Sequence, residues 1–368
     1  MSKRKKLIII IVCVVLALFL VMGLAGALLI NSYLSKVQYD TGKELVDIEG
    51  LQESILTDEE ILGELLADDP ASGEADSSQE EIDALESQMA ELLKGELEHE
   101  ADIWKDIVNV LVVGCDSRKK GGVGRSDVMI LCSVNEATEK IHMTSIMRDC
   151  YVSIPGKNNN RINAAYAFGG GSLLLDTVET NFDVDVEKYV AIDFYSFVDI
   201  VDSIGGIEIN VKEEEISLLN ESVHEMNVLN GRPKETYYVT ESGPQNLNGT
   251  QALGYARIRH IGNGDFDRTS RQRTVIAKIF EKAKTLNLLE LDDLLNTVLP
   301  MVKTNMTQGE ILSLMVKSVE YLQYDLESHR LPVDGSYQHM RVKGMAVLGI
   351  DFEENRNALK DFVLEEEE

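Results

Sequence analysis

Strand-like and helix-like apolar patterns alternate along the larger, C-terminal part of this chain, and this alternation restricts the fold more than any other feature. Apolar runs in "DIVNVLVVGCDSR", "DVMILCSVN" and "KIHMTSIMRD" are typical of strands. Apolar residues three or four positions apart in "GGSLLLDTVETNF", "RTVIAKIFEKAKTLNLL" and "TQGEILSLMVKSVEYLQYD" are typical of helices. A further helix in "LNGTQALGYARIR" has Asn248 as its expected cap. Because alternating strands and helices build layered domains, the sequence predicts an α/β domain over residues 104–364.

The first thirty residues form a separate unit. A basic head, residues 1–6, precedes an uncharged apolar run over residues 7–30, which is longer than the ~20 residues that a helix needs to cross a bilayer. The positive-inside rule places the head in the cytoplasm and the rest of the chain outside. A cleaved signal peptide is the alternative, because Ala25-Gly26-Ala27 resembles a cleavage site. We expect an uncleaved transmembrane helix, and hence a single-pass protein of the cell membrane.

Most of the formal net charge of −28 lies between the apolar run and the predicted domain. Within residues 31–103 the chain is rich in Asp and Glu, and residues 365–368 add an acidic tail, "EEEE". Ile82, Leu85, Met89 and Leu92 have the spacing of a short amphipathic helix. We interpret residues 31–103 as a solvated, acidic extracellular stalk that holds the domain away from the membrane.

Three cysteines, Cys115, Cys132 and Cys150, follow the apolar run. Their spacing fits neither a disulfide scaffold nor a metal ribbon. We interpret them as small core residues, with Cys132 and Cys150 as the pair to test for a disulfide bond.

Charged residues gather at the ends of the predicted strands, where open α/β sheets bind ligands. These residues are Asp116, Arg118, Arg125, Asp127, Arg148 and Asp149. A second group lies in "YARIRHIGNGDFDRTSRQR", residues 255–273, which holds five arginines in an otherwise acidic chain. A guanidinium group binds two phosphate oxygens at once, and carboxylates hold Mg²⁺. The two sets of charged residues together therefore predict phosphoryl transfer.

Other classes of function are disfavoured by the same sequence. The domain is net acidic and expected outside the membrane, which argues against nucleic-acid binding. "GGVGRSD" lacks the Lys-Ser/Thr ending of a P-loop, and the histidines lack the spacing of a zinc site.

Six segments, in this order along the chain, resemble the LytR-CpsA-Psr (LCP) family. They are "LVVGCDSR", "GRSDVMIL", "TSIMRDCYVSIPG", "RINAAYAFGG", "IDFYSFVDIVDSIGGIEINV" and "LNGTQALGYARIRHIGNGDFDRTSRQR". The resemblance implies a layered α-β-α catalytic domain around a central mixed sheet. It also implies a phosphotransferase that moves a glycopolymer, of the teichoic acid or capsular polysaccharide type, from a polyprenyl-pyrophosphate lipid to peptidoglycan and releases polyprenyl phosphate. Met147, where proline is frequent, and Cys115 depart from the family pattern.

Roles for individual residues follow from this resemblance. Asp116 and Asp127 would hold Mg²⁺, with Mn²⁺ as the alternative metal. The catalytic residues would be Arg148, Asp149, Arg257 and Arg259, and either Asp149 or Asp127 would accept the proton of the attacking hydroxyl. The pyrophosphate would be bound by Arg118, Arg125, Arg268, Arg271 and Gln272.

The prenyl chain of such a lipid needs an apolar slot, for which the two long helices supply candidates. These are Val275, Ile276, Ile279, Phe280, Ile311, Leu312, Met315 and Val319. Two other functions remain open: a hydrolase that releases the lipid phosphate to water, and a non-catalytic regulator that only binds wall lipids.

Overall fold

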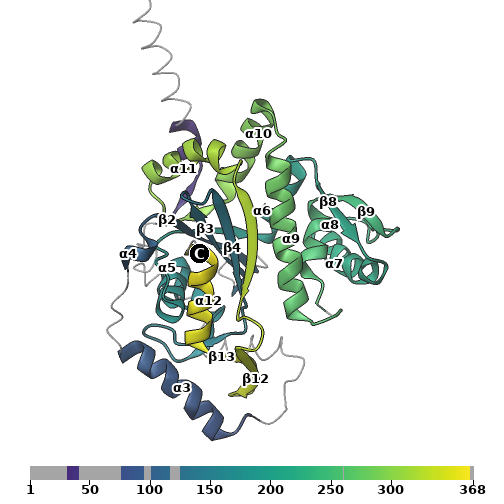
Figure 1. Ribbon diagram of the computed structural model, residues 1–368. Helices are drawn as coiled ribbons and strands as arrows, with labels where there is room; N and C mark the ends of the chain where they lie inside the picture. Colours follow the sequence, from purple (N-terminus) through teal and green to yellow (C-terminus); the bar gives the residue numbers. More distant parts are fainter. Residues whose placement is uncertain (1–30, 41–75, 95–100, 117–124, 260, 365–368) are drawn as a thin grey trace, which may run out of the picture.

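A mixed β-sheet forms the centre of the described part of the chain, residues 31–40, 76–94, 101–116, 125–259 and 261–364. The structure is a computed structural model (Figure 1). Its main sheet has seven strands in the order β1-β10-β7-β2-β3-β4-β11. The strands are β1 (Gln38–Tyr39), β2 (Ile107–Asp116), β3 (Arg125–Asn135), β4 (Lys140–Ile146), β7 (Tyr189–Asp193), β10 (Lys303–Thr304) and β11 (Asp325–Leu331). The expected α/β domain with a central mixed sheet is confirmed.

The register of the central strands decides where their polar ends lie. Strands β2, β3 and β4 form an antiparallel meander, and the β3–β4 turn is closed by Asn135, whose Oδ1 accepts hydrogen bonds from the backbone of Ala137 and Thr138. Strand β7 runs parallel to β2, and β11 runs parallel to β4. The start of β3 therefore lies beside the ends of β2 and β4, so the charged residues at these ends share one edge of the sheet.

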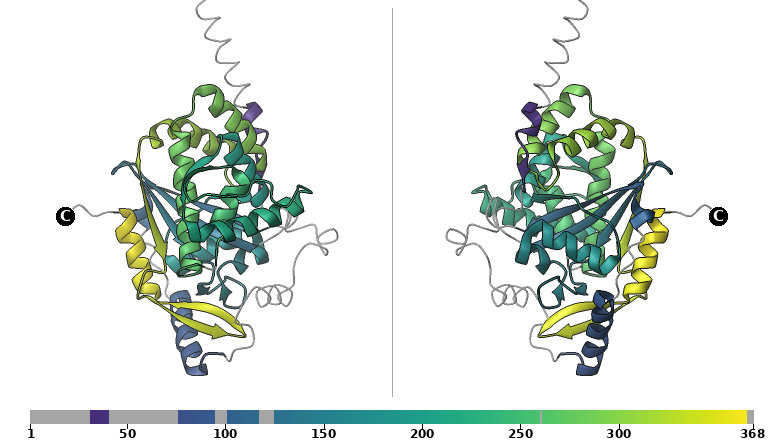
Figure 2. Two further views of the ribbon diagram at one scale, coloured as in Figure 1. Left: turned by 90° about the vertical axis from the view of Figure 1, so that its right-hand side faces the viewer. Right: turned by 90° about the vertical axis from the view of Figure 1, so that its left-hand side faces the viewer.

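Helices cover both faces of the sheet (Figure 2). One face packs on α5 (Ala164–Phe182) and α12 (Phe352–Leu364), and α3 (Gln79–Lys94) packs on α5. The other face packs on α9 (Asp265–Ala283), α10 (Leu288–Val298) and α11 (Gln308–Tyr321). Because successive strand residues point to opposite faces, Leu111 and Val113 of β2 join the first core while Val110 packs with Leu299 and Ile311 in the second.

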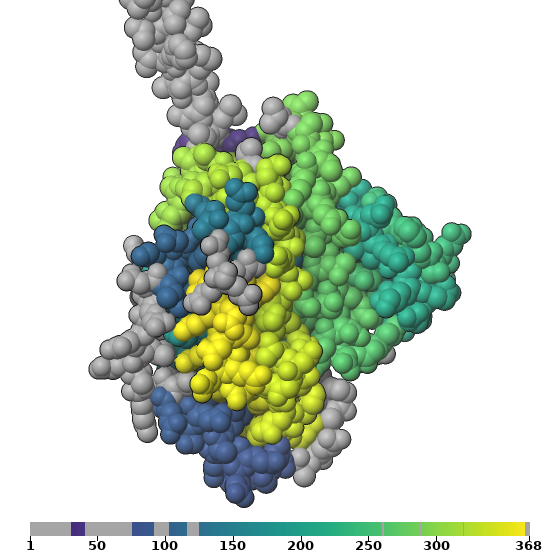
Figure 3. Space-filling model, in the orientation of Figure 1, coloured from purple at the N-terminus to yellow at the C-terminus, as the bar shows by residue number. Residues whose placement is uncertain are grey.

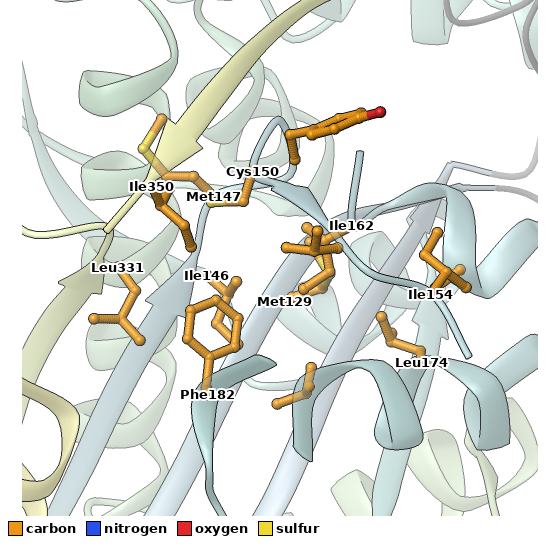
Figure 4. Close-up of a cluster of buried hydrophobic side chains, with 14 of the residues drawn as sticks. Met129, Ile146, Met147, Cys150, Ile154, Ile162, Leu174, Phe182, Leu331 and Ile350 are labelled. Carbon is orange, nitrogen blue, oxygen red and sulfur yellow. The ribbon is translucent and has the colours of Figure 1, made fainter. Parts of the chain in front are cut away.

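The larger core lies under α5 and joins several strands. Figure 4 shows Phe182 of α5 pointing toward Ile146 of β4, with Leu331 of β11 beside them. Phe182 and Leu331 are fully buried. Burial of one such side chain stabilises the fold by about 1.5–3 kcal/mol, so this cluster fixes the ends of β4 and β11, from which site residues emerge.

A side lobe with its own core carries the arginine-rich segment. It contains α7 (Ile216–Leu229), α8 (Gly249–Arg257) and a ribbon of β8 (Ile207–Val211) and β9 (Gly243–Leu247), and it packs against α6 (Phe194–Ser203). Asn248 caps α8, as expected, by accepting a hydrogen bond from the backbone of Gln251. Gly249 lies so close to the Val198 carbonyl of α6 that any β-carbon would collide with it. This close packing fixes the direction in which α8 delivers its C-terminal arginines.

A hairpin that the sequence patterns did not predict completes the domain. It consists of β12 (Tyr337–Val342) and β13 (Met345–Ile350) and lies at the same end of the molecule as the charged strand ends (Figure 1). The backbone N–H of Leu348 donates to the carbonyl of Asp149 at 2.8 Å. Two short strands, β5 (Tyr151–Val152) and β6 (Asn160–Arg161), pair next to this contact.

Two segments of the expected stalk belong to the folded domain. Ile82, Leu85 and Met89 of α3 are buried in the larger core, and Figure 3 shows α3 packed against the β12–β13 hairpin at one end of the molecule. Further upstream, β1 adds an edge strand to the main sheet beside β10. The interpretation of residues 31–103 as one solvated stalk therefore differs from the structure, because the apolar stripe of α3 finds a partner surface that sequence spacing cannot reveal.

Three further expectations concern the cysteines, the predicted transmembrane run and the acidic tail. Cys115, Cys132 and Cys150 are free, so the suggested Cys132–Cys150 disulfide is absent. The predicted transmembrane run, residues 7–30, and the acidic tail, residues 365–368, lie outside the described residues. Among the residues that are described, no helix has the length and apolar character needed to cross a membrane.

Candidate functional site

Arg148 is the centre of a buried group of charges at the edge of the sheet. It follows the end of β4, and its side chain is only 9% exposed. Its Nη1 donates to Oδ1 of Asp127, the third residue of β3, at 2.9 Å. Its Nε lies 3.3 Å from Oδ2 of Asp265 and 3.7 Å from Oδ2 of Asp149. One guanidinium group thus connects three carboxylates from three segments of the chain.

The first turn of α9 contributes a second guanidinium group. Arg268 is buried, and its Nη2 donates to Oδ2 of Asp265 at 2.6 Å, three residues earlier on the helix. Asp265 and Asp267 both lie in this first turn, where the helix dipole favours negative charge. Asp265 thereby links Arg268 to Arg148.

Arg259 reaches the same group from the side lobe. Its Nη2 lies 3.6 Å from Oδ2 of Asp127. The chain between α8 and α9 turns back through Gly262 and Gly264, whose φ angles of 68° and 60° are strained for other residues. The backbone N–H of Asn263 donates to Oδ2 of Asp267 at 2.9 Å and holds this turn on α9.

A fourth guanidinium group, that of Arg161, approaches from β6. Its Nε lies 3.5 Å from Oδ1 of Asp149 and donates to the carbonyl of Ala346, in the hairpin, at 2.8 Å. We call the whole set the ionic cluster. It comprises Asp127, Arg148, Asp149, Arg161, Arg259, Asp265 and Arg268.

Burial and neighbouring charges act in opposite directions on the carboxylates of the ionic cluster. Burial alone would raise the pKa of Asp127, but the guanidinium groups of Arg148, Arg268 and Arg259 outweigh it and hold that pKa below its usual range. Burial raises the pKa of Asp149, and here the neighbouring arginines offset only part of the effect. Asp127 is therefore a permanently charged anchor, whereas Asp149 is the carboxylate better suited to accept a proton.

The guanidinium groups of the ionic cluster are also placed for an anion. Burial lowers the pKa of Arg268 to about 10, and the positive charges of Arg148 and Arg259 add to this effect by repulsion. Four guanidinium groups face three carboxylates, which leaves an excess of positive charge among the described members. Nε of Arg268 is buried without a hydrogen-bond acceptor, and Nε of Arg148 has only the longer ion-pair contacts with Asp265 and Asp149. An anionic ligand would satisfy these donors and relieve the repulsion.

Other residues expected at the site lie outside the ionic cluster. Arg257 pairs with Glu225 at 3.0 Å and stacks over the ring of Phe194, so the structure does not bring it to Arg148. Arg125 opens β3 opposite the backbone of Asp116, and Gln272 lies half-buried on α9. Arg118 and the side chain of Asp116 are outside the described residues.

The proposed lipid-lining residues are divided among three apolar clusters. Val275 and Ile279 belong to the core of the side lobe, and Val275 is only 1% exposed. Phe280 packs with Tyr321 and Tyr324, and Met315 packs with Ile311 and Leu299. Ile276 and Leu312 are half-buried, and the side chain of Val319 is not described. The structure does not gather this set along one slot, because the two helices present their apolar faces to different partners.

Arg271 has a role that the family resemblance did not indicate. Its Nε donates to Oε1 of Glu215 at 2.9 Å, and its Nη1 donates to the carbonyl of Ile258 at 3.2 Å. Both charged side chains of this ion pair are buried. Since Ile258 directly precedes Arg259, Arg271 positions the backbone that carries Arg259 rather than presenting its own charge to a ligand.

Three residues without a role in the sequence analysis, Asp265, Arg161 and Glu215, differ in how far the sequence could have identified them. Asp265 stands inside the arginine-rich segment and Arg161 inside "RIN", so their neighbourhood was visible. Glu215 lies in "KEEEI", one of several acidic runs, and nothing local distinguishes it. The packing of α7 against α8, and of α8 against α9, brings it to Arg271.

Removal of Arg271 is expected to destabilise the domain because it leaves Glu215 as a buried, unpaired charge. Arg271→Met should lower the free energy of unfolding by about 3–5 kcal/mol, and the double variant Arg271→Met/Glu215→Leu should recover most of that loss. Lys278→Met, which breaks an exposed pair with Glu281, is the control and should cost less than about 1 kcal/mol. Urea denaturation measures all three; an Arg271→Met protein as stable as the wild type would contradict the assignment.

Comparison with known proteins identifies the family of this chain. The model of the LytR_cpsA_psr family matches residues 73–361. The chain is 34% identical over 241 residues to the polyisoprenyl-teichoic acid–peptidoglycan teichoic acid transferase TagU of Bacillus licheniformis, covering 64% of this chain and 72% of that protein. It is 29% identical over 263 residues to the regulatory protein MsrR of Staphylococcus aureus, covering 70% and 75%.

A solved structure shares the fold as well. The LytR-CPS2A-psr family protein YwtF (TagT) with bound octaprenyl pyrophosphate lipid superposes with a TM-score of 0.53 and 25% identity, covering 72% of this chain and 91% of that chain. The family model extends over most of the chain and includes α3, which the structure also places in the domain. The chain therefore belongs to the LytR_cpsA_psr family.

Proposed function

We propose that this protein transfers a glycopolymer from a polyprenyl-pyrophosphate carrier to a sugar hydroxyl of peptidoglycan. The products would be a phosphodiester-linked polymer and polyprenyl phosphate. The observation that carries the proposal is the convergence of Arg148, Arg161, Arg259 and Arg268, from four separate segments, on one buried group of carboxylates. The transferase activity named for TagU and the octaprenyl pyrophosphate bound to TagT support the same substrate class.

The charges of the ionic cluster suit the proposed donor. A pyrophosphate diester carries two negative charges, and planar guanidinium groups pair with phosphate oxygens through two hydrogen bonds each. As the bridging P–O bond breaks, negative charge grows on the departing lipid phosphate. The buried Arg268 and the partly exposed Arg259 would stabilise that charge, because donors already oriented by ion pairs need little rearrangement during the reaction.

Asp149 is the proposed general base. The acceptor hydroxyl oxygen would attack the phosphorus that carries the polymer, and its proton would pass to Asp149, whose raised pKa makes it the better acceptor. The ion pairs with Arg148 and Arg161 fix the orientation of this carboxylate. Asp127, held ionised between Arg148 and Arg259, would instead orient both guanidinium groups.

Mg²⁺ is the proposed metal, with Asp127 and Asp116 as its ligands. The donor chemistry fits, since Mg²⁺ prefers carboxylate oxygens and Asp127 stays ionised. Asp116 ends the strand beside the start of β3, so the two aspartates share one sheet edge. No group of three or more metal-binding side chains occurs among the described residues, so phosphate oxygens and water would complete the coordination. Bound Mg²⁺ would add positive charge to offset that of the pyrophosphate.

The membrane placement follows from the same proposal. A lipid-linked donor stays in the bilayer, so the enzyme gains from an anchor, which the apolar run of residues 7–30 would supply. The catalytic domain would then lie outside the cell membrane, next to the peptidoglycan acceptor. A pure regulator, which the name of MsrR suggests, would bind the lipid without turnover; a hydrolase would release lipid phosphate without an acceptor.

Loss of Arg259 should abolish transfer without unfolding the domain. Arg259→Ala is expected to lower the rate of polyprenyl phosphate release by about 10²–10³-fold, because it removes one oriented donor from the developing charge. Mass spectrometry of products from a synthetic lipid-linked donor, with and without peptidoglycan, measures the change. Arg232→Ala removes an exposed arginine of the side lobe and should keep full activity. Full activity in Arg259→Ala would exclude the proposed donor site, and release without acceptor would favour the hydrolase.

Replacement of the proposed base should separate chemistry from binding. Asp149→Asn keeps the shape of the side chain but cannot accept the proton, so transfer should fall by about 10²–10⁴-fold. Binding of a prenyl pyrophosphate, measured by calorimetry, should change little. A variant with near-normal turnover would show that another group takes the proton.

Metal dependence is expected from the proposed role of Asp127. Chelation with EDTA should stop transfer by the wild-type protein, and added Mg²⁺ should restore it. Binding of Mg²⁺ in the presence of a prenyl pyrophosphate, measured by calorimetry, should be lost in Asp127→Asn. Turnover that persists in EDTA would argue that arginines alone stabilise the transferred phosphate.

A further inference from the structure

Three aromatic rings gather directly beside the ionic cluster. Phe266 follows Asp265 on α9, and its ring centroid lies 5.1 Å from that of Tyr337 and 6.5 Å from that of His339. The rings of Tyr337 and His339 are 5.7 Å apart. The guanidinium carbon of Arg330 lies 4.5 Å from the centroid of Phe266. We call Phe266, Tyr337, His339 and Arg330 the aromatic platform.

The platform combines apolar ring faces with polar edges at the surface. Tyr337 and His339 are two positions apart on β12 and so point to the same side of the strand. Phe266 and Tyr337 are half-buried against the larger core, whereas His339 is exposed. Core packing accounts for the inner edges of the first two rings. Core packing does not explain why the exposed imidazole of His339 lies next to the rings of Phe266 and Tyr337.

Backbone contacts fix the platform relative to the proposed base. The N–H of Leu348 on β13 donates to the carbonyl of Asp149 at 2.8 Å, and Nε of Arg161 donates to the carbonyl of Ala346 at 2.8 Å. The hairpin that carries Tyr337 and His339 is therefore attached to the two residues that flank the reaction site. On the other side, Phe266 and Asp265 are consecutive residues of α9.

The chemistry of this surface matches a sugar chain. A pyranose ring has a C–H face that stacks on aromatic rings and a rim of hydroxyl and amide groups that pair with polar edges. A prenyl chain would require an aliphatic lining, and an anionic polymer would meet Arg330 already paired with Asp334 at 2.5 Å. In an in-line displacement the attacking hydroxyl must approach the phosphorus opposite the leaving lipid phosphate.

We propose that the aromatic platform binds the acceptor glycan, a chain of N-acetylated amino sugars, and presents its hydroxyl to Asp149. This inference rests on the proposed transferase function and identifies the surface that its second substrate uses. The platform residues position the acceptor and take no part in bond making or breaking.

Binding of the acceptor alone tests the platform independently of catalysis. The probe is a soluble tetrasaccharide of alternating N-acetylglucosamine and N-acetylmuramic acid whose muramic carboxyl groups are amidated, so that it is neutral; it is titrated without donor and followed by NMR. We expect the wild-type protein to bind it and Tyr337→Ala and His339→Ala each to raise Kd about tenfold, as the loss of one ring contact implies. Tyr237→Ala removes an exposed tyrosine that also lies beside an arginine, Arg232, and should leave Kd unchanged.

The donor provides the second measurement. Affinity for a short-chain prenyl pyrophosphate should stay at the wild-type value in Tyr337→Ala and His339→Ala, while KM for the glycan acceptor rises and kcat with saturating acceptor is retained. The inference is overturned if the wild type does not bind the tetrasaccharide, if neither variant weakens that binding, or if donor affinity falls in parallel. If the protein binds the glycan through the platform but has no transfer activity, the proposed function is refuted while the platform remains a glycan-binding surface.

Discussion

The burial of Arg148 beside Asp127 is the interaction on which the arrangement of the site depends. A guanidinium group that is almost fully removed from water is tolerated only when carboxylates surround it, because an unpaired buried charge costs several kcal/mol. Asp127 comes from β3 and Asp265 from α9, so pairing all three brings the central sheet and the long helix together at one point. Such pairs add little net stability compared with an apolar core. Their effect here is geometric, since they hold separate segments in a single reactive arrangement.

Much of this architecture could be predicted from the sequence, and the successes share a cause. Strands such as β3 and helices such as α8 are determined by local patterns, including the Asn248 cap, and the same strand patterns placed Arg148, Asp149 and Asp127 at strand ends. The failures concern contacts between distant segments. The apolar spacing of α3 could be recognised in the sequence, but the surface that α3 covers is built from residues far along the chain. Arg271 was assigned to the ligand because sequence cannot show that Glu215 takes its charge first.

The contrast between Asp127, near the start of β3, and Asp149, after the end of β4, shows why residue type alone does not assign chemistry. Asp127 is buried and Asp149 is partly buried, and both face Arg148, yet their pKa values move in opposite directions. Three guanidinium groups act on each carboxylate, so the difference lies in how close they are and in the negative charge of Asp265, which raises the pKa of Asp149. Asp127 receives a direct hydrogen bond from Arg148, whereas Asp149 is only in longer ion pairs with Arg148 and Arg161. The opposite pKa shifts thus arise from differences of less than about one ångström in the separation of charged groups, which a sequence motif does not encode.

The edge strand β1 has a consequence for the order in which the chain can fold. Its partner on the sheet is β10, and Gln38 pairs with Lys303. A ribosome makes the N-terminal segment first, so β1 must wait until nearly the whole polypeptide has emerged before it can dock. Long sequence separations of this kind slow folding and leave early segments unprotected in the meantime. The high density of negative charge in the residues that follow β1 would keep that waiting segment apart from other nascent chains by simple repulsion.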